Sequence, residues 1–364
     1  MTSYRNLHRF ALVTAVCTFL LIIAGGFVTS TGSGLSVPDW PNTYGHFMFA
    51  FPLDQMVGGI FYEHTHRMIA SAVGFMTLIL AIWLWKREDR RWVRNLGLAA
   101  VGLVVGQGVL GGLTVLLLLP AAISVGHATL AQSFFVVVSS IALFTSPWWR
   151  NGEPLPPDKK DLRIPIVWLS ASAALAVFIQ LMLGALMRHT DSGLAVPDFP
   201  LAYGQLFPSL SPEAMARYNE QLIDSGIRIS ADGPVISSQI AIHMVHRLWA
   251  LPVLLLVAWT SIRLAKLSPV SRRLPRFAYL LTGLVAVQIL LGAMTVLSGK
   301  SVLVATAHVA TGALLLVGLV LASLHAVRLF GIPRGALGSS LAREMPGRGT
   351  GGSPEPESAC QGAS

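Results

Sequence analysis

Charged residues and cysteine are scarce in this chain of 364 residues. Only 12% of the residues are charged, whereas a soluble globular domain carries about 25%. This deficit excludes an ordinary soluble fold. The chain has two cysteines, Cys17 inside a long apolar run and Cys360 near the end. They fall on incompatible sides for a bridge, which excludes a disulfide framework.

Apolar residues take the place of the missing charges, at 53% of the chain. They gather in runs close to the roughly 20 residues that a helix needs to cross the hydrocarbon core of a bilayer. The first run has no evident cleavage site, so we expect it to be a retained helix. The sequence therefore predicts an all-α membrane protein with eight transmembrane helices, at about 10–29, 66–85, 96–118, 126–145, 165–187, 243–262, 277–298 and 302–326.

Acidic residues are few, 17 against 26 Lys and Arg, and the net charge is +9. The placement of the cations indicates topology rather than nucleic-acid binding, because most of them flank the spans on the side of the N-terminus. This is the positive-inside bias, and it places both termini in the cytoplasm, with lipid around the spans and no nucleic acid as a partner. The outer side keeps only Arg67, Arg188, Arg217, Arg228, Arg247 and Lys300.

The chain is a tandem duplication. GGFVTSTGSGLSVPDWPNTYG from Gly25 matches GALMRHTDSGLAVPDFPLAYG from Gly184, and QGVLGGLTVL from Gln107 matches QILLGAMTVL from Gln288. Each repeat holds four spans, so both enter the membrane in the same direction, as parallel repeats related by a pseudo-two-fold axis along the membrane normal. We expect two tandem four-helix bundles, 1–150 and 165–328, joined by a cytoplasmic linker, 151–164, and followed by a disordered tail, 329–364.

Four histidines recur in repeat register, each near the start of an even-numbered span: His66 with His127, and His246 with His308. All four are therefore expected near the outer face. Two neutral imidazoles that face each other across a bundle core suit the two axial positions of a haem iron, and they are too few for a zinc site. Histidines bonded to the backbone or to neighbouring helices are the alternative, but a fourfold repeat favours a functional site.

The residues beside these histidines distinguish the two halves. Arg67 and Arg247 directly follow a histidine, and each either pairs with haem propionates or is an interfacial arginine. Glu63 precedes His66 by three residues and shares its helical face, whereas His243 stands at the matching position of the second repeat. We interpret the lone carboxylate as the sign that one site reacts while the other serves it. The alternative is a glutamate that is favoured by the dipole of a helix N-terminus.

The repeated loops and two glutamines are weaker candidates. The loops place Asp39 and Asp198, with Trp40 and Phe199, either at a porphyrin edge or in a purely structural turn. Gln107 and Gln288 are expected to hydrogen-bond across their bundles rather than to face a haem. An insert in the second loop, SPEAMARYNEQLIDSG, predicts a short amphipathic helix on the outer surface, and a packing role is favoured over a partner site.

The EHTHR motif at 63–67, the paired histidines, the duplicated SGLSVPDWP-type loops and the eight spans together resemble haem A synthases over about residues 8–326. The resemblance implies oxidation of the C8 methyl of haem O to a formyl group, with oxygen from water, which gives haem A for terminal oxidases. It also implies that His246 and His308 bind a prosthetic haem b, that His66 and His127 mark the site of the substrate haem O, and that Glu63 takes part in catalysis.

The same resemblance implies haem O synthase (the protohaem farnesyltransferase) and oxidase assembly factors as partners, and it leaves room for a homo-oligomer. Two departures stand out. The outer-loop cysteine pair of some bacterial members is missing, and Thr29 stands at the position that matches Arg188, where other members have arginine. A bis-histidine diheme electron carrier linked to quinol is the main alternative. It leaves Glu63 unexplained, and its haems should lie on opposite sides of the membrane.

Overall fold

The structure is a computed structural model, and it describes residues 2–151, 163–227, 233–269 and 271–330. In these ranges the regular structure is helical, and eight helices are long and apolar enough to cross a membrane, which confirms the predicted class. The eight are α1 (Thr2–Ser30), α2 (Gly58–Arg87), α3 (Arg91–Leu116), α4 (Ala121–Thr145), α6 (Arg163–His189), α8 (Ser237–Ala265), α9 (Leu274–Leu297) and α10 (Val302–Phe330).

Several helices begin earlier than the hydropathy predicts. The spans expected from 66, 126 and 243 start at Gly58, Ala121 and Ser237, up to two turns sooner. Polar side chains in these extra turns, such as Glu63, are buried because the preceding loop covers them and supplies hydrogen-bond partners. Hydropathy alone does not see such tertiary contacts, so the predicted starts were wrong.

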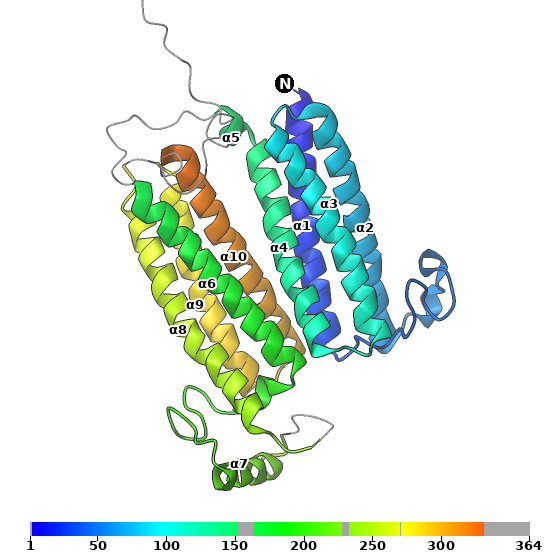
Figure 1. Ribbon diagram of the computed structural model, residues 1–364, viewed down its shortest axis with the longest axis vertical. Coiled ribbons are helices and arrows are strands. Elements are labelled where there is room, and N and C mark those ends of the chain that lie inside the picture. Colours follow the sequence, from blue (N-terminus) through cyan, green and yellow to red (C-terminus); the bar gives the residue numbers. More distant parts are fainter. Residues whose placement is uncertain (1, 152–162, 228–232, 270, 331–364) are drawn as a thin grey trace, which may run out of the picture.

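The long helices form two bundles that stand side by side (Figure 1). In one, α1 and α3 each pack against α2 and α4, and in the other α6 and α9 each pack against α8 and α10. The bundles meet where α1 packs against α10 and α4 packs against α6. The symmetry axis and the two domain boundaries stay predictions, and the linker and tail segments 152–162 and 331–364 lie outside the described residues.

The buried apolar core of each bundle lies at the end that carries the N-terminus. In the first bundle Leu7, Leu84 and Ile141 are buried there, and in the second Leu264 and Leu319 are buried at the same end. Figure 1 shows this end at the top, with the short helix α5 (Pro147–Asn151) beside it. At the opposite end, a further cluster of buried apolar residues joins the segment 194–235 to Ile240 of α8.

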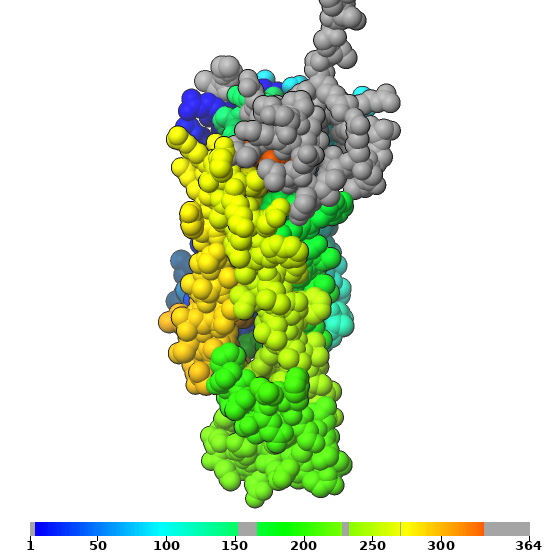
Figure 2. Space-filling view, turned by 90° about the vertical axis from the view of Figure 1, so that its left-hand side faces the viewer, coloured from blue at the N-terminus to red at the C-terminus, as the bar shows by residue number. Residues whose placement is uncertain are grey.

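The predicted amphipathic helix is present as α7 (Pro212–Asp224) and confirms the interpretation of the insert. Ser211 caps its N-terminus by accepting a hydrogen bond from the N–H of Ala214 at 3.3 Å. Tyr218 and Leu222 of α7 pack on Val196 of the second repeated loop. Figure 2 shows this green segment beneath the yellow and orange helices α8 and α9, at the end away from the N-terminus. The helix therefore packs over the second bundle.

Candidate haem sites

The four histidines lie on helices that all begin at the end away from the N-terminus: His66 on α2, His127 on α4, His246 on α8 and His308 on α10. The prediction that they share one side of the molecule is therefore confirmed by the course of the chain. Each sits one to three turns inside its helix, at the end away from the main apolar core of its bundle. The paired histidines come from helices that share neighbours but lie across the bundle from each other.

A glycine on the neighbouring helix faces each imidazole ring. A Cβ at any of these glycines would lie 3.0–3.3 Å from the ring Cε1, closer than ordinary van der Waals contact allows. The four glycines form two repeat-related pairs, so the contact is built into the duplication. Sequence reasoning missed them, although the aligned repeats contain the signal: Gly25 with His66, Gly111 with His127, Gly184 with His246 and Gly292 with His308.

The rings themselves are left with unused hydrogen-bonding capacity. In His66, His127, His246 and His308 the Nδ1 atom is buried and has no hydrogen-bond partner among the described residues. Four orphaned imidazole nitrogens in repeat register are costly unless a ligand orders the rings. No group of three or more metal-ligating side chains exists in the described part of the chain. The donor set therefore fits a haem iron, which needs two axial ligands, better than a metal ion that is held by protein alone.

Glutamine side chains contact the histidines, and they do so differently in the two bundles. Gln107 donates to the backbone carbonyl of His127 at 2.9 Å, as predicted for a bond across the bundle. Its repeat partner Gln288 instead places its amide 3.4 Å from Nε2 of His308. Gln180, which sequence reasoning missed, lies 3.3 Å from Nε2 of His246 and donates to its carbonyl at 3.0 Å.

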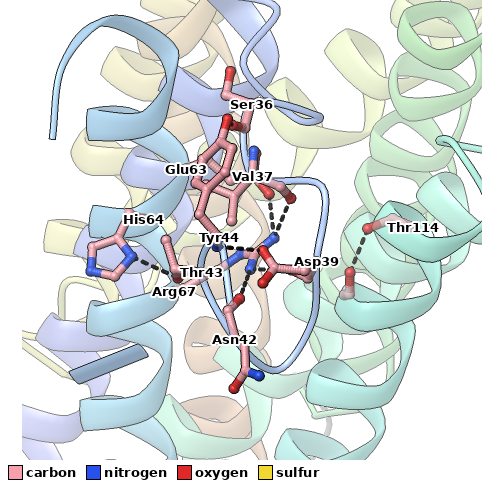
Figure 3. A network of polar contacts seen from close by, with 11 residues as sticks. Ser36, Val37, Asp39, Asn42, Thr43, Tyr44, Glu63, His64, Arg67 and Thr114 are labelled. Atoms are coloured by element: carbon pink, nitrogen blue, oxygen red, sulfur yellow. Dashed lines mark hydrogen bonds and ion pairs between the residues drawn. The ribbon is translucent and has the colours of Figure 1, made fainter. Parts of the chain in front are cut away.

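Glu63 and Arg67 fasten the first repeated loop to α2 (Figure 3). The carboxylate of Glu63 is 4% exposed, forms an ion pair of 2.6 Å with Nη2 of Arg67, and accepts the N–H of Val37 at 2.8 Å. Arg67 also donates to the carbonyls of Val37, Asp39 and Asn42 at 2.7–3.0 Å. The guanidinium that we expected either at propionates or at the lipid interface thus binds loop carbonyls.

The second half builds the same junction without a carboxylate. Nδ1 of His243 lies 2.9 Å from the carbonyl of Ser192, and Nε2 accepts from Nε of Arg247 at 2.9 Å. Arg247 also donates to the carbonyls of Val196, Asp198 and Leu201. The imidazole of His243 therefore takes the place of the Glu63 carboxylate. The two residues occupy matching positions beside the arginine and the loop of their own half, and they differ in charge.

The aspartates of both loops are used within their own turns. Asp39 accepts the N–H groups of Tyr44 and Gly45, each at 2.8 Å, and Asp198 accepts those of Tyr203 and Gly204. Burial alone raises the pKa of the Asp39 carboxyl, but these two N–H groups outweigh it and lower the pKa below its usual value. This geometry supports the structural interpretation of the loops.

Two neighbouring side chains complete the first site. The indole of Trp40 lies against Gly112 of α3, where a Cβ would meet ring carbons at 2.7 Å. The second repeat has Phe199 and Ala293 at these positions, a smaller ring with a larger partner residue. His64 is 3% exposed, and its Nδ1 lies 3.1 Å from Oγ1 of Thr43 beneath the first loop.

Comparison with known proteins agrees with this geometry. The family described as cytochrome oxidase assembly protein (COX15-CtaA) matches residues 8–320. The chain belongs to this family. The family match covers all eight spans and both histidine pairs. Similar proteins named heme A synthase include one from Halalkalibacterium halodurans, 30% identical over 59% of this chain and 70% of the relative.

Two further relatives with that name align over longer stretches. The protein from Lysinibacillus sphaericus is 24% identical over 85% of this chain and 91% of its own length. The protein from Rhizorhabdus wittichii is 26% identical over 86% of this chain and 92% of its own length. The likeness to relatives in this family thus extends through both bundles rather than one.

Proposed function

We propose that this protein is a haem A synthase, a membrane oxidoreductase that converts haem O to haem A. The observation that carries the proposal is the repeated set of buried imidazoles, each with an orphaned Nδ1 and each facing a glycine. Membership of a family whose relatives are named heme A synthase supplies the reaction. The product would serve terminal oxidases, in keeping with the description of the family.

The two sites take different roles in this proposal. His66 and His127 hold the substrate haem O, because the lone carboxylate, Glu63, lies in their bundle. His246 and His308 hold a resident haem b, whose chemistry when bound is one-electron transfer. With both His66 and His127 as ligands, the substrate iron would have no free coordination position, which favours water as the source of the formyl oxygen.

The protein's own groups act on water and on protons at the first site. To reach the formyl level, the methyl carbon gains an oxygen from water and gives up electrons and protons in equal number. The haem b held by His246 and His308 would accept the electrons one at a time. Each oxygen of Glu63 already accepts one hydrogen bond, from Arg67 or from Val37, and each keeps a lone pair for a further donor. Glu63 is therefore proposed as the general base that takes a proton from water, and its ion pair with Arg67 orients it.

The surroundings follow from topology and charge. We propose that both termini are cytoplasmic and that the haem sites lie near the outer face of a bacterial inner membrane, as the positive-inside bias indicates. The proposed partners are haem O synthase, which would deliver haem O, and oxidase assembly factors, which would receive haem A. The diheme electron carrier is less favoured, because both histidine pairs lie at one end of the helices.

Pigment analysis tests this function. Cells that express the chain together with a source of haem O are expected to accumulate a haem with a formyl group, which is identified by its mass and by its pyridine haemochrome spectrum. The matched control is His66→Ala together with His127→Ala, which should leave haem O unconverted. Unaltered haem b and haem O from the wild-type chain would contradict the proposal and favour an electron carrier.

A further inference from the structure

The outer ends of the two bundles share a backbone geometry but differ in charge. The turn after α3 places Leu118 and Leu119 at φ of 59° and 60°, and the turn after α9 places Gly299 and Lys300 at 62° and 65°. The N–H of Leu119 donates to the carbonyl of Thr114, as that of Lys300 donates to the carbonyl of Thr295. Lys300 therefore occupies the place that an uncharged leucine takes in the first half.

The contacts of these two side chains also match. A Cβ on Gly34 would lie 3.4 Å from Leu119, and a Cβ on Gly193 would lie 3.4 Å from Cδ of Lys300. Gly34 and Gly193 are the same position of the repeated loop. The stem of Lys300 thus lies along the loop of the second site, as Leu119 lies along the loop of the first.

A second cation lies next to the first. Arg188 is one turn after Gly184, the glycine that contacts His246, and residues four apart share a helical face. Its Nη2 donates to the carbonyl of Thr29, the residue that stands at its own repeat position. Burial and the nearby guanidinium of Arg188 lower the pKa of the Lys300 ammonium, whereas Asp191 acts in the opposite direction.

The carboxylate of Asp191 acts electrostatically on both cations but forms no ion pair with either of them. Both side chains are half-buried, and no salt bridge joins Arg188 or Lys300 to a carboxylate among the described residues. Arg67 and Arg247, in contrast, already donate to several loop carbonyls. Two half-buried cations beside one carboxylate leave an excess of positive charge, which suits an anionic ligand. The acidic groups of a porphyrin are its carboxylates, which match a guanidinium fork.

We propose that Arg188 and Lys300 bind the carboxylates of the haem in the second bundle. Their counterparts in the first bundle, Thr29 and Leu119, are uncharged and do not bind carboxylates in this way. The inference rests on the proposed function. It explains how one duplicated architecture keeps a resident haem in one half and exchanges substrate for product in the other. Because the two histidine pairs are alike, the charge at the outer end of each bundle sets how long the haem is retained.

The test compares the purified wild-type protein with Arg188→Thr combined with Lys300→Leu, which are the residues of the first half. Transfer of haem b to excess apomyoglobin is followed by absorbance, and reconstitution is repeated with the dimethyl ester of haem b, which has no free carboxylates. We expect the double variant to lose haem at least about tenfold faster. We also expect it to lose the preference for haem b over the ester.

Three further variants make the result specific. Arg188→Lys with Lys300→Arg keeps both charges and should keep the preference for haem b, while Arg217→Leu removes an exposed cation of α7 and should change nothing. Thr29→Arg with Leu119→Lys should slow release of haem O from the first bundle. Helical circular dichroism of each variant shows that it is folded.

The outcomes separate this inference from the function on which it rests. Equal haem release and an unchanged preference in the folded double variant would overturn the carboxylate assignment while leaving haem A synthesis intact. Faster loss from the first bundle in place of the second would overturn the assignment of Arg188 and Lys300 to the resident haem. A wild-type protein that binds no haem would overturn the proposed function itself.

Discussion

Histidine and glycine act together at the residue scale. The histidines were predictable, because an imidazole inside an apolar span is rare and four in repeat register are rarer. The glycines were not singled out, since glycine is common in membrane helices and its role appears only when the facing ring is placed. Gly25 and Gly184 show that the signal was present in the aligned repeats, where both halves keep the residue.

Replacing one of these glycines should weaken one haem site. Gly184→Val places carbon where an ideal Cβ is already 3.1 Å from Cε1 of His246. Overpacking of this kind costs about 1–3 kcal/mol, or roughly five- to 150-fold in binding. Haem b content and its dissociation rate in purified protein measure the effect. Gly283→Val is the matched control, because a Cβ at this position of α9 would meet no atom within 4 Å. Equal haem loss in both variants would contradict a role for the contact between Gly184 and His246.

Glu63 allows a second prediction at this scale. Glu63→Gln keeps the shape and one acceptor oxygen but removes the base, so the rate of haem A formation should fall about a hundredfold or more. The absorption spectrum of the resident haem b should not change, because His246 and His308 lie in the other bundle. A normal rate in the Gln variant would remove Glu63 from the mechanism. A shifted haem b spectrum would indicate that the variant disturbs the fold.

The roles of the arginines depended on contacts that no pattern contains. Arg67 and Arg247 follow directly on histidines, which suggested either propionates or the lipid interface. The chain instead folds its loop carbonyls around both guanidinium groups. Loop backbones have no sequence signature for such contacts, since any residue supplies a carbonyl.

At the scale of whole elements, hydropathy placed all eight spans but not their ends. Helix α8 continues outward past the apolar run because Gln239 and His243 find partners in the second loop. The amphipathic pattern of α7 was sufficient to predict it, since Tyr218 and Leu222 recur on one face. Helix ends were less predictable than helix faces, because they depend on tertiary hydrogen bonds.

The turn between α2 and α3 carries a prediction about pH. Although burial by itself raises the pKa of Glu88, hydrogen bonds and charge from Arg90, together with Arg150, lower it below its usual value. A lowered pKa in the folded state stabilises the protein above the unfolded pKa, and this stabilisation is lost as the pH falls through the folded pKa. Glu88→Gln should therefore lower the Tm by several degrees at pH 7.

Thermal unfolding in detergent, followed by circular dichroism, measures this difference. It should shrink as the pH is lowered into the range in which carboxylates protonate, because the wild-type protein then loses the same charge. Asp89→Asn, which replaces the neighbouring acid at an exposed position, is the control. A Tm difference that stays constant from neutral to acidic pH would show that Glu88 stabilises the turn by packing alone.

Across the whole molecule, the duplication predicted two four-helix bundles with their histidines at one end. It did not predict that the apolar core of each bundle would lie at the opposite end, because burial depends on how the helices converge. That separation puts the main apolar core of each bundle at one end and its histidine pair at the other.

The orientation of the whole molecule in the membrane is directly testable. In a background without Cys17 and Cys360, Ser209→Cys should react with a membrane-impermeant maleimide in cells whose outer membrane has been removed. Ser268→Cys should react only after lysis. Both serines are exposed, and they lie at opposite ends of the helices. Labelling in the reverse order would contradict the positive-inside assignment and place the haem sites on the cytoplasmic side.

The central claim is that each histidine pair holds one porphyrin and that only the first pair holds the substrate. Optical spectra and extracted pigments of four single variants, His66→Ala, His127→Ala, His246→Ala and His308→Ala, test it most directly in cells that make haem O. We predict that the last two lose the resident haem b, and that the first two retain it but make no formyl haem. Unchanged spectra in all four variants, or loss of haem b from the first two, would contradict the account.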